Sequence, residues 1–180
     1  YWDEPWIERT KEWVADAVDR GLPFLGVCWG HQLLADVLGG TVENMGEYEI
    51  GYRAVTHTGD SRLFEGIDEE FTVFTTHQDR VTHPPPESEL IAENDYGIHG
   101  FRKGRVFTVQ FHPEYDMQSA RRIAGEKELP PEQNRRVEQG ITDENYRAAC
   151  EPKQLCDNFL AYVGEVRGGE VSDSTVAADD

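Results

Sequence analysis

Residues 26–30 read Gly-Val-Cys-Trp-Gly, and they place a cysteine where an apolar stretch gives way to a helical one. This G-x-C-x-G pattern is the cysteine form of the nucleophile elbow, in which a sharp strand-to-helix turn raises the nucleophile above the edge of a sheet. The helix N-terminus favours a thiolate, and the backbone N–H of Trp29 can donate to an oxyanion. A cysteine that only packs in a core needs no such turn, so we predict that Cys28 is a nucleophile.

A nucleophilic cysteine needs a base, and the base needs a group that orients it. Of the six histidines, His112 stands at the end of an apolar stretch, in the sequence TVQFHPEY. Pro113 favours an extended conformation at His112, and in an extended chain Glu114 lies on the same side as the imidazole. We therefore predict a triad of Cys28, His112 and Glu114, in which the carboxylate fixes the tautomer and stabilises the imidazolium.

A metal site is the other chemistry that this region suggests, because His31 follows Cys28 by three residues. A zinc site needs three or four ligands, and no Cys or His pair elsewhere has a spacing that completes one. Cys150 and Cys156 lie in a helical stretch and are expected to pack there. Because the sequence also has neither a Walker loop nor a G-x-G-x-x-G loop, we expect no metal and no cofactor.

The elements that must position these residues follow from the hydrophobic pattern. Residues 3–20 and 31–38 have the spacing of amphipathic helices, and residues 23–27 between them form an apolar run suited to a buried strand. Residues 116–166 are helical in pattern. Five further strands are expected between these helices, at 50–58, 70–77, 88–93, 97–101 and 105–111. This order predicts an α/β domain with a mostly parallel sheet flanked by helices.

The ends of the chain carry two further expectations. The domain is placed at residues 1–166, and residues 167–180, which have almost no apolar side chains to bury, are expected to form a disordered acidic tail. Sheets of this kind normally start with a strand, whereas this chain opens on a helix. We therefore expect an N-terminal portion of the domain to be absent.

The charge balance is strongly acidic, with 35 Asp and Glu against 17 Lys and Arg and a formal net charge of −18. The acids are spread through the whole chain, which predicts a hydrated surface of the salt-adapted kind and excludes nucleic acid as a partner. No apolar run approaches the ~18 residues of a membrane span. Three cysteines are too few for a disulfide framework, so a cytoplasmic location is expected.

Four separated motifs together resemble the class I, or triad-type, glutamine amidotransferases. They are GVCWGHQLLADVLGG with its cysteine elbow, VQFHPE, EIGYR at 49–53 and VFTTHQDRV at 73–81. The last two resemble the E-[LI]-G strand and the S/T-H-x-D segment of that family. The motifs occur in the family's order over roughly residues 5–116, and the resemblance is strongest to stand-alone domains related to the glutaminase part of GMP synthase.

The resemblance implies a flavodoxin-like fold and assigns the triad as nucleophile, general base and acid, and orienting carboxylate. It also implies that the amino-acid end of glutamine is held by Gln32 and by the backbone around two further residues. The substrate-contacting residues expected on this basis are Trp29, Gln32, Thr76 and His77.

The sequence departs from the family in two places. The glycine-rich loop that supplies a second oxyanion N–H before the elbow is not in this chain, and about forty residues separate Glu114 from the segment CDNFLAYV. Hydrolysis of the glutamine side-chain amide is the leading hypothesis, with ammonia passing to a synthetase on a separate chain because no ATP-binding sequence is present. Two alternatives stay open, a γ-glutamyl peptide hydrolase with the same triad and a non-catalytic regulatory module on the same fold.

Overall fold

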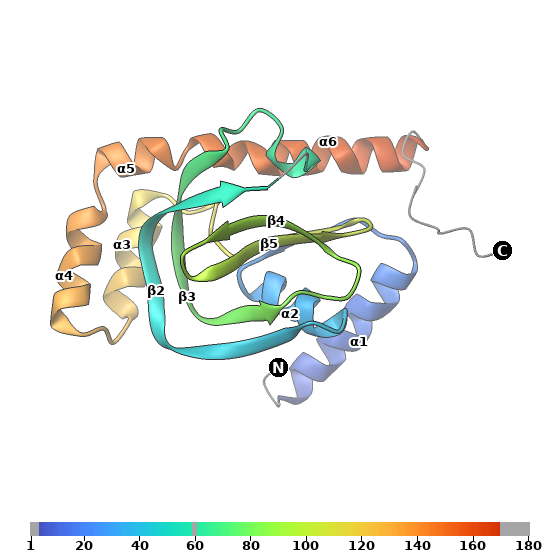
Figure 1. The fold of residues 1–180 in the computed structure, drawn as a ribbon, viewed down its shortest axis with the longest axis horizontal. Helices are drawn as coiled ribbons and strands as arrows, with labels where there is room; N and C mark the ends of the chain where they lie inside the picture. The colour runs from blue at the N-terminus through green and yellow to red at the C-terminus, as the bar shows by residue number, and fades with distance from the viewer. Residues whose placement is uncertain (1–3, 59–60, 170–180) are drawn as a thin grey trace.

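The apolar and alternating stretches of the chain form a six-stranded sheet in the order β1-β6-β5-β4-β2-β3. This computed structural model describes residues 4–58 and 61–169. The strands are β1 (Phe24–Val27), β2 (Thr41–His57), β3 (Glu70–His83), β4 (Glu89–Asn94), β5 (Gly97–Lys103) and β6 (Val106–Val109). The α-helices are α1 (Pro5–Asp19), α2 (Trp29–Val37), α3 (Met117–Glu126), α4 (Pro131–Gly140), α5 (Asp143–Ala148) and α6 (Gln154–Gly168). Figure 1 shows α6 along one side of the sheet and α3, α4 and α5 gathered at one end.

The described strands form a mixed sheet. Strands β1 and β6 pair in parallel, whereas the other four strand pairs are antiparallel. The predicted α/β fold with helices flanking a sheet is confirmed, but the pairing is less parallel than expected. Short turns such as Gly104-Arg105 between β5 and β6 can join only antiparallel neighbours. The parallel pair aligns Val27 with Val109, so the ends of β1 and β6 lie together at one sheet edge.

Helix α1 covers the strand that leads to the cysteine. Its Ile7, Val14 and Ala17 are buried, as the helical spacing predicts. The two tryptophans of the same apolar pattern, Trp6 and Trp13, are 55% and 63% exposed. Within the described residues, no helix combines the length and the apolar character that crossing a bilayer requires.

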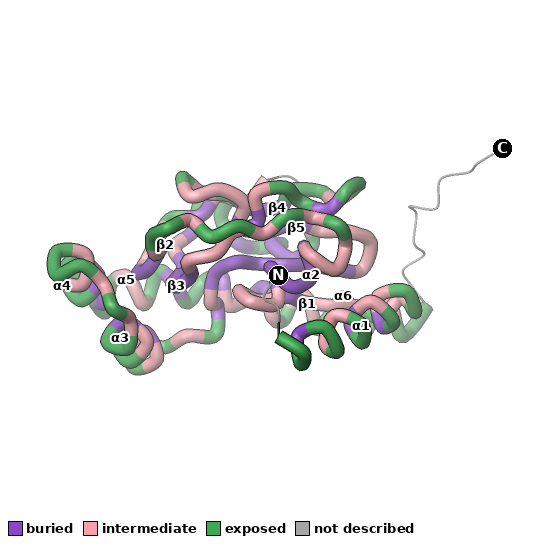
Figure 2. Tube along the Cα trace, turned by 90° about the horizontal axis from the view of Figure 1, so that it is seen from below, coloured by how far each residue is buried: buried purple, intermediate pink, exposed green. Residues whose placement is uncertain are grey.

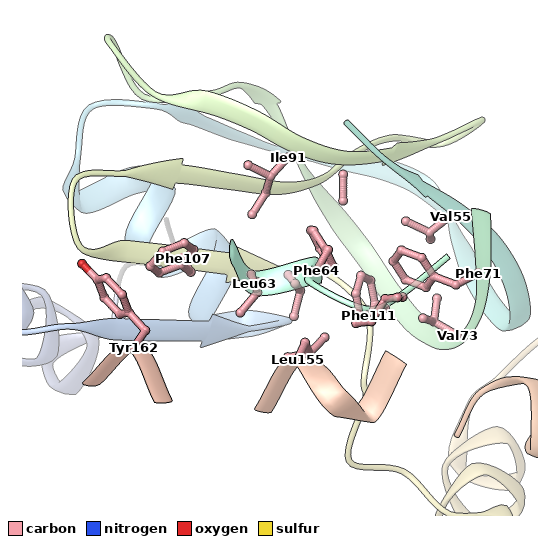
Figure 3. Close-up of a cluster of buried hydrophobic side chains, with 13 residues drawn as sticks. Val55, Leu63, Phe64, Phe71, Val73, Ile91, Phe107, Phe111, Leu155 and Tyr162 are labelled. Carbon is pink, nitrogen blue, oxygen red and sulfur yellow. The ribbon is translucent and has the colours of Figure 1, made fainter. Parts of the chain in front are cut away.

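Helix α6 closes the main hydrophobic core. Figure 3 shows Leu155 and Tyr162 of α6 facing Phe107, Phe111 and neighbouring side chains of the sheet. The helix continues to Gly168, past residue 166 where the domain was expected to end, and the rest of the expected tail at 170–180 lies outside the described residues.

The long segment after Glu114 forms the helices α3, α4 and α5. Apolar side chains of α3 and α4, including Ala120 and Val137, pack with Ile50 of β2 and Phe74 of β3. Figure 2 shows that the buried residues concentrate along the sheet, whereas much of α4 is exposed. These helices therefore pack against the inner parts of β2 and β3, and the Phe74 carbonyl of β3 accepts from the backbone N–H of His112.

Candidate active site

Cys28 occupies the junction between β1 and α2. Its backbone angles are φ 50° and ψ −103°, in a region that residues other than glycine rarely adopt. The Cys28 N–H donates to the carbonyl of Val109 at 2.8 Å, which continues the parallel pairing of β1 and β6 by one residue. Strained backbone of this kind persists only where the surroundings hold it, and it concentrates at functional sites.

The two glycines of the elbow have different roles. A Cβ atom at Gly26 would lie 2.5 Å from Leu34 Cδ1 and 2.7 Å from the carbonyl oxygen of Gly30, so only glycine lets β1 and α2 approach this closely. A Cβ atom at Gly30 would meet no described heavy atom within 4 Å. Packing therefore requires Gly26, while Gly30 leaves open space beside the nucleophile.

His112 is held between a carboxylate and the nucleophile. Its Nδ1 lies 2.7 Å from Glu114 Oε1, and its backbone N–H donates to the Phe74 carbonyl at 2.9 Å. The imidazole also stacks on the Tyr115 ring, with 4.2 Å between the centroids. Since Glu114 occupies Nδ1, Nε2 is the ring nitrogen that is left to interact with Cys28.

The electrostatics of the triad favour a charged pair. Burial acts to lower the pKa of His112, but the hydrogen bonds and charges of Cys28 and Glu114 outweigh it and raise this pKa to about 9. Burial likewise acts to raise the pKa of Glu114, and the bond to His112 lowers it below its ordinary value. The raised pKa favours the charged imidazolium form of His112 next to Cys28.

The four residues expected to contact a substrate lie near Cys28 and are mostly buried. The carbonyl oxygen of Thr76 lies 4.0 Å from Cys28 Sγ, and Trp29 follows Cys28 as the first residue of α2. Gln32, His77 and Thr76 are only 3%, 5% and 8% exposed. The Gln32 amide donates to the Asp79 carbonyl at 2.8 Å.

A buried polar cluster around Glu49, which the sequence analysis did not predict, includes His77. Glu49 Oε2 lies 2.7 Å from His77 Nε2 and 3.0 Å from His99 Nε2, and Glu49 Oε1 accepts from Asn94 at 2.7 Å. The partners of Glu49 lie 28 to 50 positions after it in the chain. The EIGYR match contained Glu49, but no spacing in the sequence links it to His99.

This cluster is the group of three donors in the described chain that could hold a metal ion. Its donor atoms face each other at direct hydrogen-bond distances, and His77 Nδ1 lies 2.9 Å from the Asp79 carbonyl, an acceptor. Both ring nitrogens of His77 therefore face oxygen atoms of the protein, Nε2 that of Glu49 and Nδ1 that of Asp79. Burial acts to raise the pKa of Glu49, and the two histidines lower it far below its ordinary range. We interpret the cluster as a buried ion pair that supports the site.

Comparison with known proteins relates the whole arrangement to one family. The family profile described as "Glutamine amidotransferase class-I" matches residues 3–125. The chain belongs to the class I glutamine amidotransferase family. The resemblance carried by the four motifs is thereby confirmed, and the elbow, Glu49, His112 and Glu114 all lie inside the matched part of this amidotransferase chain.

The curated relatives of this amidotransferase are GMP synthases. This chain is 47% identical over 98 residues to the enzyme named "GMP synthase [glutamine-hydrolyzing]" of Thermus thermophilus. The match covers 52% of this chain and 19% of the relative. The enzyme of the same name from Pyrobaculum aerophilum is 40% identical over 122 residues, with 64% and 24% covered. The chain thus spans about a fifth to a quarter of the length of these relatives.

A solved glutamine amidotransferase from Thermotoga maritima has the same fold. It superimposes with a TM-score of 0.76 at 24% identity, over 89% of this chain and 70% of that one. This similarity supports the fold, including the part of the chain beyond residue 125.

Proposed function

We propose that this class I glutamine amidotransferase hydrolyses the side-chain amide of glutamine through Cys28, His112 and Glu114. The single observation that carries the proposal is the position of His112, whose Nδ1 lies 2.7 Å from Glu114 Oε1 and whose pKa is raised by its interactions with Cys28 and Glu114. A nucleophile, a base and an orienting carboxylate in this order are the groups that acyl transfer requires.

In the proposed reaction the Cys28 thiolate attacks the amide carbon of glutamine. The backbone N–H of Trp29, at the N-terminus of α2, accommodates the developing oxyanion. The His112 imidazolium then protonates the leaving nitrogen, the C–N bond breaks and ammonia leaves. Neutral His112 next takes a proton from water, which attacks the γ-glutamyl thioester, and glutamate and the Cys28 thiolate are released while His112 regains its charge.

For substrate binding we propose Trp29 and the backbone at Thr76, which lie next to the nucleophile, as the contacts closest to the amide. Gln32 and His77 stay proposed contacts for the amino-acid end of glutamine. Their side chains are buried and bonded to the protein, so His77 would act through its backbone.

The proposed acceptor of ammonia is a synthetase on a separate chain. The relatives named GMP synthase support a partner of this kind, because the match covers only 19% and 24% of their length.

A coupled glutamate assay tests the function. The wild-type protein is expected to release glutamate from glutamine faster than from a γ-glutamyl dipeptide, and Cys28→Ala to release none. Glu114→Ala should lower kcat by on the order of 100-fold, since it disturbs the base rather than the nucleophile. Cys150→Ala, which changes an exposed cysteine, is the control and should keep full activity. Faster hydrolysis of the dipeptide, or activity that survives Cys28→Ala, would refute the proposal.

A further inference from the structure

Gln110 is a buried side chain directly beside the nucleophile. It follows β6, is 0% exposed, and its Nε2 lies 3.6 Å from Cys28 Sγ, which is within hydrogen-bond reach of a sulfur acceptor. Both backbones are fixed, since the Gln110 N–H donates to the His99 carbonyl at 2.8 Å and Cys28 N–H donates to Val109 at 2.8 Å. The amide nitrogen therefore meets the sulfur from the side of the sheet.

The orientation of the Gln110 amide is set by Gln32. Gln32 lies one helical turn after Cys28, and its Nε2 donates to Gln110 Oε1 at 3.1 Å and to the Asp79 carbonyl at 2.8 Å. Because the carbonyl oxygen of Gln110 accepts from Gln32, its NH₂ group must point towards the sulfur. The opposite orientation would set two NH₂ groups against each other.

The buried ion pair holds the far end of this chain of hydrogen bonds. The Asp79 carbonyl that accepts from Gln32 also accepts from His77 Nδ1 at 2.9 Å, and His77 is bound to Glu49. Each group in the series has a single arrangement of donors and acceptors, so the direction of the last N–H is fixed before a substrate binds. Preorganised donors of this kind stabilise charge at the moment it forms.

We propose that Gln110 is a further catalytic residue, whose amide N–H stabilises the Cys28 thiolate and fixes the direction of its sulfur, and that Gln32 is the positioning residue that orients this amide. His112 interacts with Cys28 as well, so the Gln110 amide would add a second donor to the imidazolium. A thiolate in a partly buried site needs such donors to replace water. The proposal rests on the proposed function only in taking Cys28 as the nucleophile.

Alkylation of Cys28 by iodoacetamide, followed by peptide mass spectrometry, tests this role without requiring turnover. Gln110→Met keeps the length of the side chain and removes the donor. We expect it to slow alkylation at pH 7 about five- to tenfold, as the loss of one charge-assisted hydrogen bond predicts, and to approach the wild-type rate at strongly alkaline pH. Gln110→Glu, which sets a carboxylate against the sulfur, should be slower still.

Thr108→Val is the matched control. Thr108 is buried on β6, two residues before Gln110, and its hydroxyl bonds to His31 and Phe101 rather than to Cys28. This variant should disturb the core about as much as Gln110→Met does and keep the alkylation rate within about twofold of wild type. A folded Gln110→Met protein that alkylates at the wild-type rate at pH 7 would overturn the proposal. If that variant does not fold, a wild-type rate in Gln110→Glu would do so.

Steady-state kinetics separate the two roles of Gln32. As a positioning residue it predicts that Gln32→Met lowers kcat and slows alkylation of Cys28 by iodoacetamide about threefold. As a glutamine contact alone it predicts a raised KM and unchanged alkylation, and that result would remove Gln32 from the positioning role. Failure of the proposed function would show as absent glutamate release by the wild type, which leaves the alkylation comparison intact.

Discussion

His112 Nδ1 and Glu114 Oε1 lie 2.7 Å apart, and only Pro113 stands between these two residues in the chain. The contact is local, and it contributes to the raised pKa of a histidine that is largely buried. Because of this shift, the free energy of unfolding should depend on pH.

The stability of the protein should fall as the pH rises from about 6.5 to 9. The His112 pKa is about 9 in the folded state against 6.5 in the unfolded chain, so its stabilisation is complete below 6.5 and lost through 9. Urea unfolding measures this. Between pH 6.5 and 9, the free energy of unfolding of the wild type should fall by up to about 3 kcal/mol more than that of His112→Asn. The fall in the free energy of unfolding with pH should be smaller in Cys28→Ala than in the wild type, because this variant lacks one of the groups that raise the pKa of His112. Equal pH dependence in wild type and His112→Asn would contradict this assignment.

Substitution by alanine should have different effects on stability at the two glycines of the elbow. Gly26→Ala forces a Cβ atom against Leu34 and the Gly30 carbonyl, and we expect it to lower the free energy of unfolding by about 2 kcal/mol. Gly30→Ala meets open space within α2 and should leave stability unchanged or raise it by up to about 1 kcal/mol. Chemical denaturation of both variants measures this, and equal losses would show that the two glycines pack alike.

Loss of the Glu49 charge should be costly, because His77 and His99 would face a neutral partner in the core. Glu49→Gln is expected to lower the free energy of unfolding by about 3 kcal/mol, whereas Glu43→Gln, at an exposed position of β2, should change it by less than about 0.5 kcal/mol. Treatment with a chelator should leave the melting temperature unchanged. A melting temperature that falls with the chelator, together with stoichiometric metal in the untreated protein, would show that the cluster is a metal site and not an ion pair.

The acidic surface predicts that salt stabilises the fold. With a formal net charge of −18, screening of carboxylate repulsion should raise the melting temperature by roughly 5 °C between about 0.1 M and about 1 M potassium chloride. Sorbitol at matched osmolality is the control and should raise it less. A melting temperature that falls or stays constant in salt would count against the salt-adapted interpretation.

The elements around the nucleophile could be predicted from the sequence because their signals are local. The apolar run 23–27, the glycine before Cys28 and the His-Pro-Glu segment each act within a few residues. Strand β2, by contrast, begins at Thr41 rather than near residue 50. Its first half is largely exposed and its register shifts between Asn44 and Glu49, so no clean alternation marks it.

The supporting side chains could not be predicted because their contacts cross the sheet. Gln110 and Cys28 are 82 positions apart, and Glu49 and His99 are 50 apart. A buried glutamine on a strand has no pattern that distinguishes it from a solvated one, and only the pairing of β1 with β6 brings Gln110 to the sulfur. The substrate roles expected for Gln32 and His77 came from family resemblance, which carries no information on burial.

Covalent trapping of the nucleophile tests the central claim most directly. Diazo-oxo-norleucine, an electrophilic analogue of glutamine, should form a stoichiometric adduct that peptide mass spectrometry places on Cys28, and excess glutamine should protect against it. The triad mechanism predicts this adduct in wild type, its slower formation in Glu114→Ala and its absence in Cys28→Ala. An adduct on Cys150 or Cys156 with Cys28 unmodified would contradict the account.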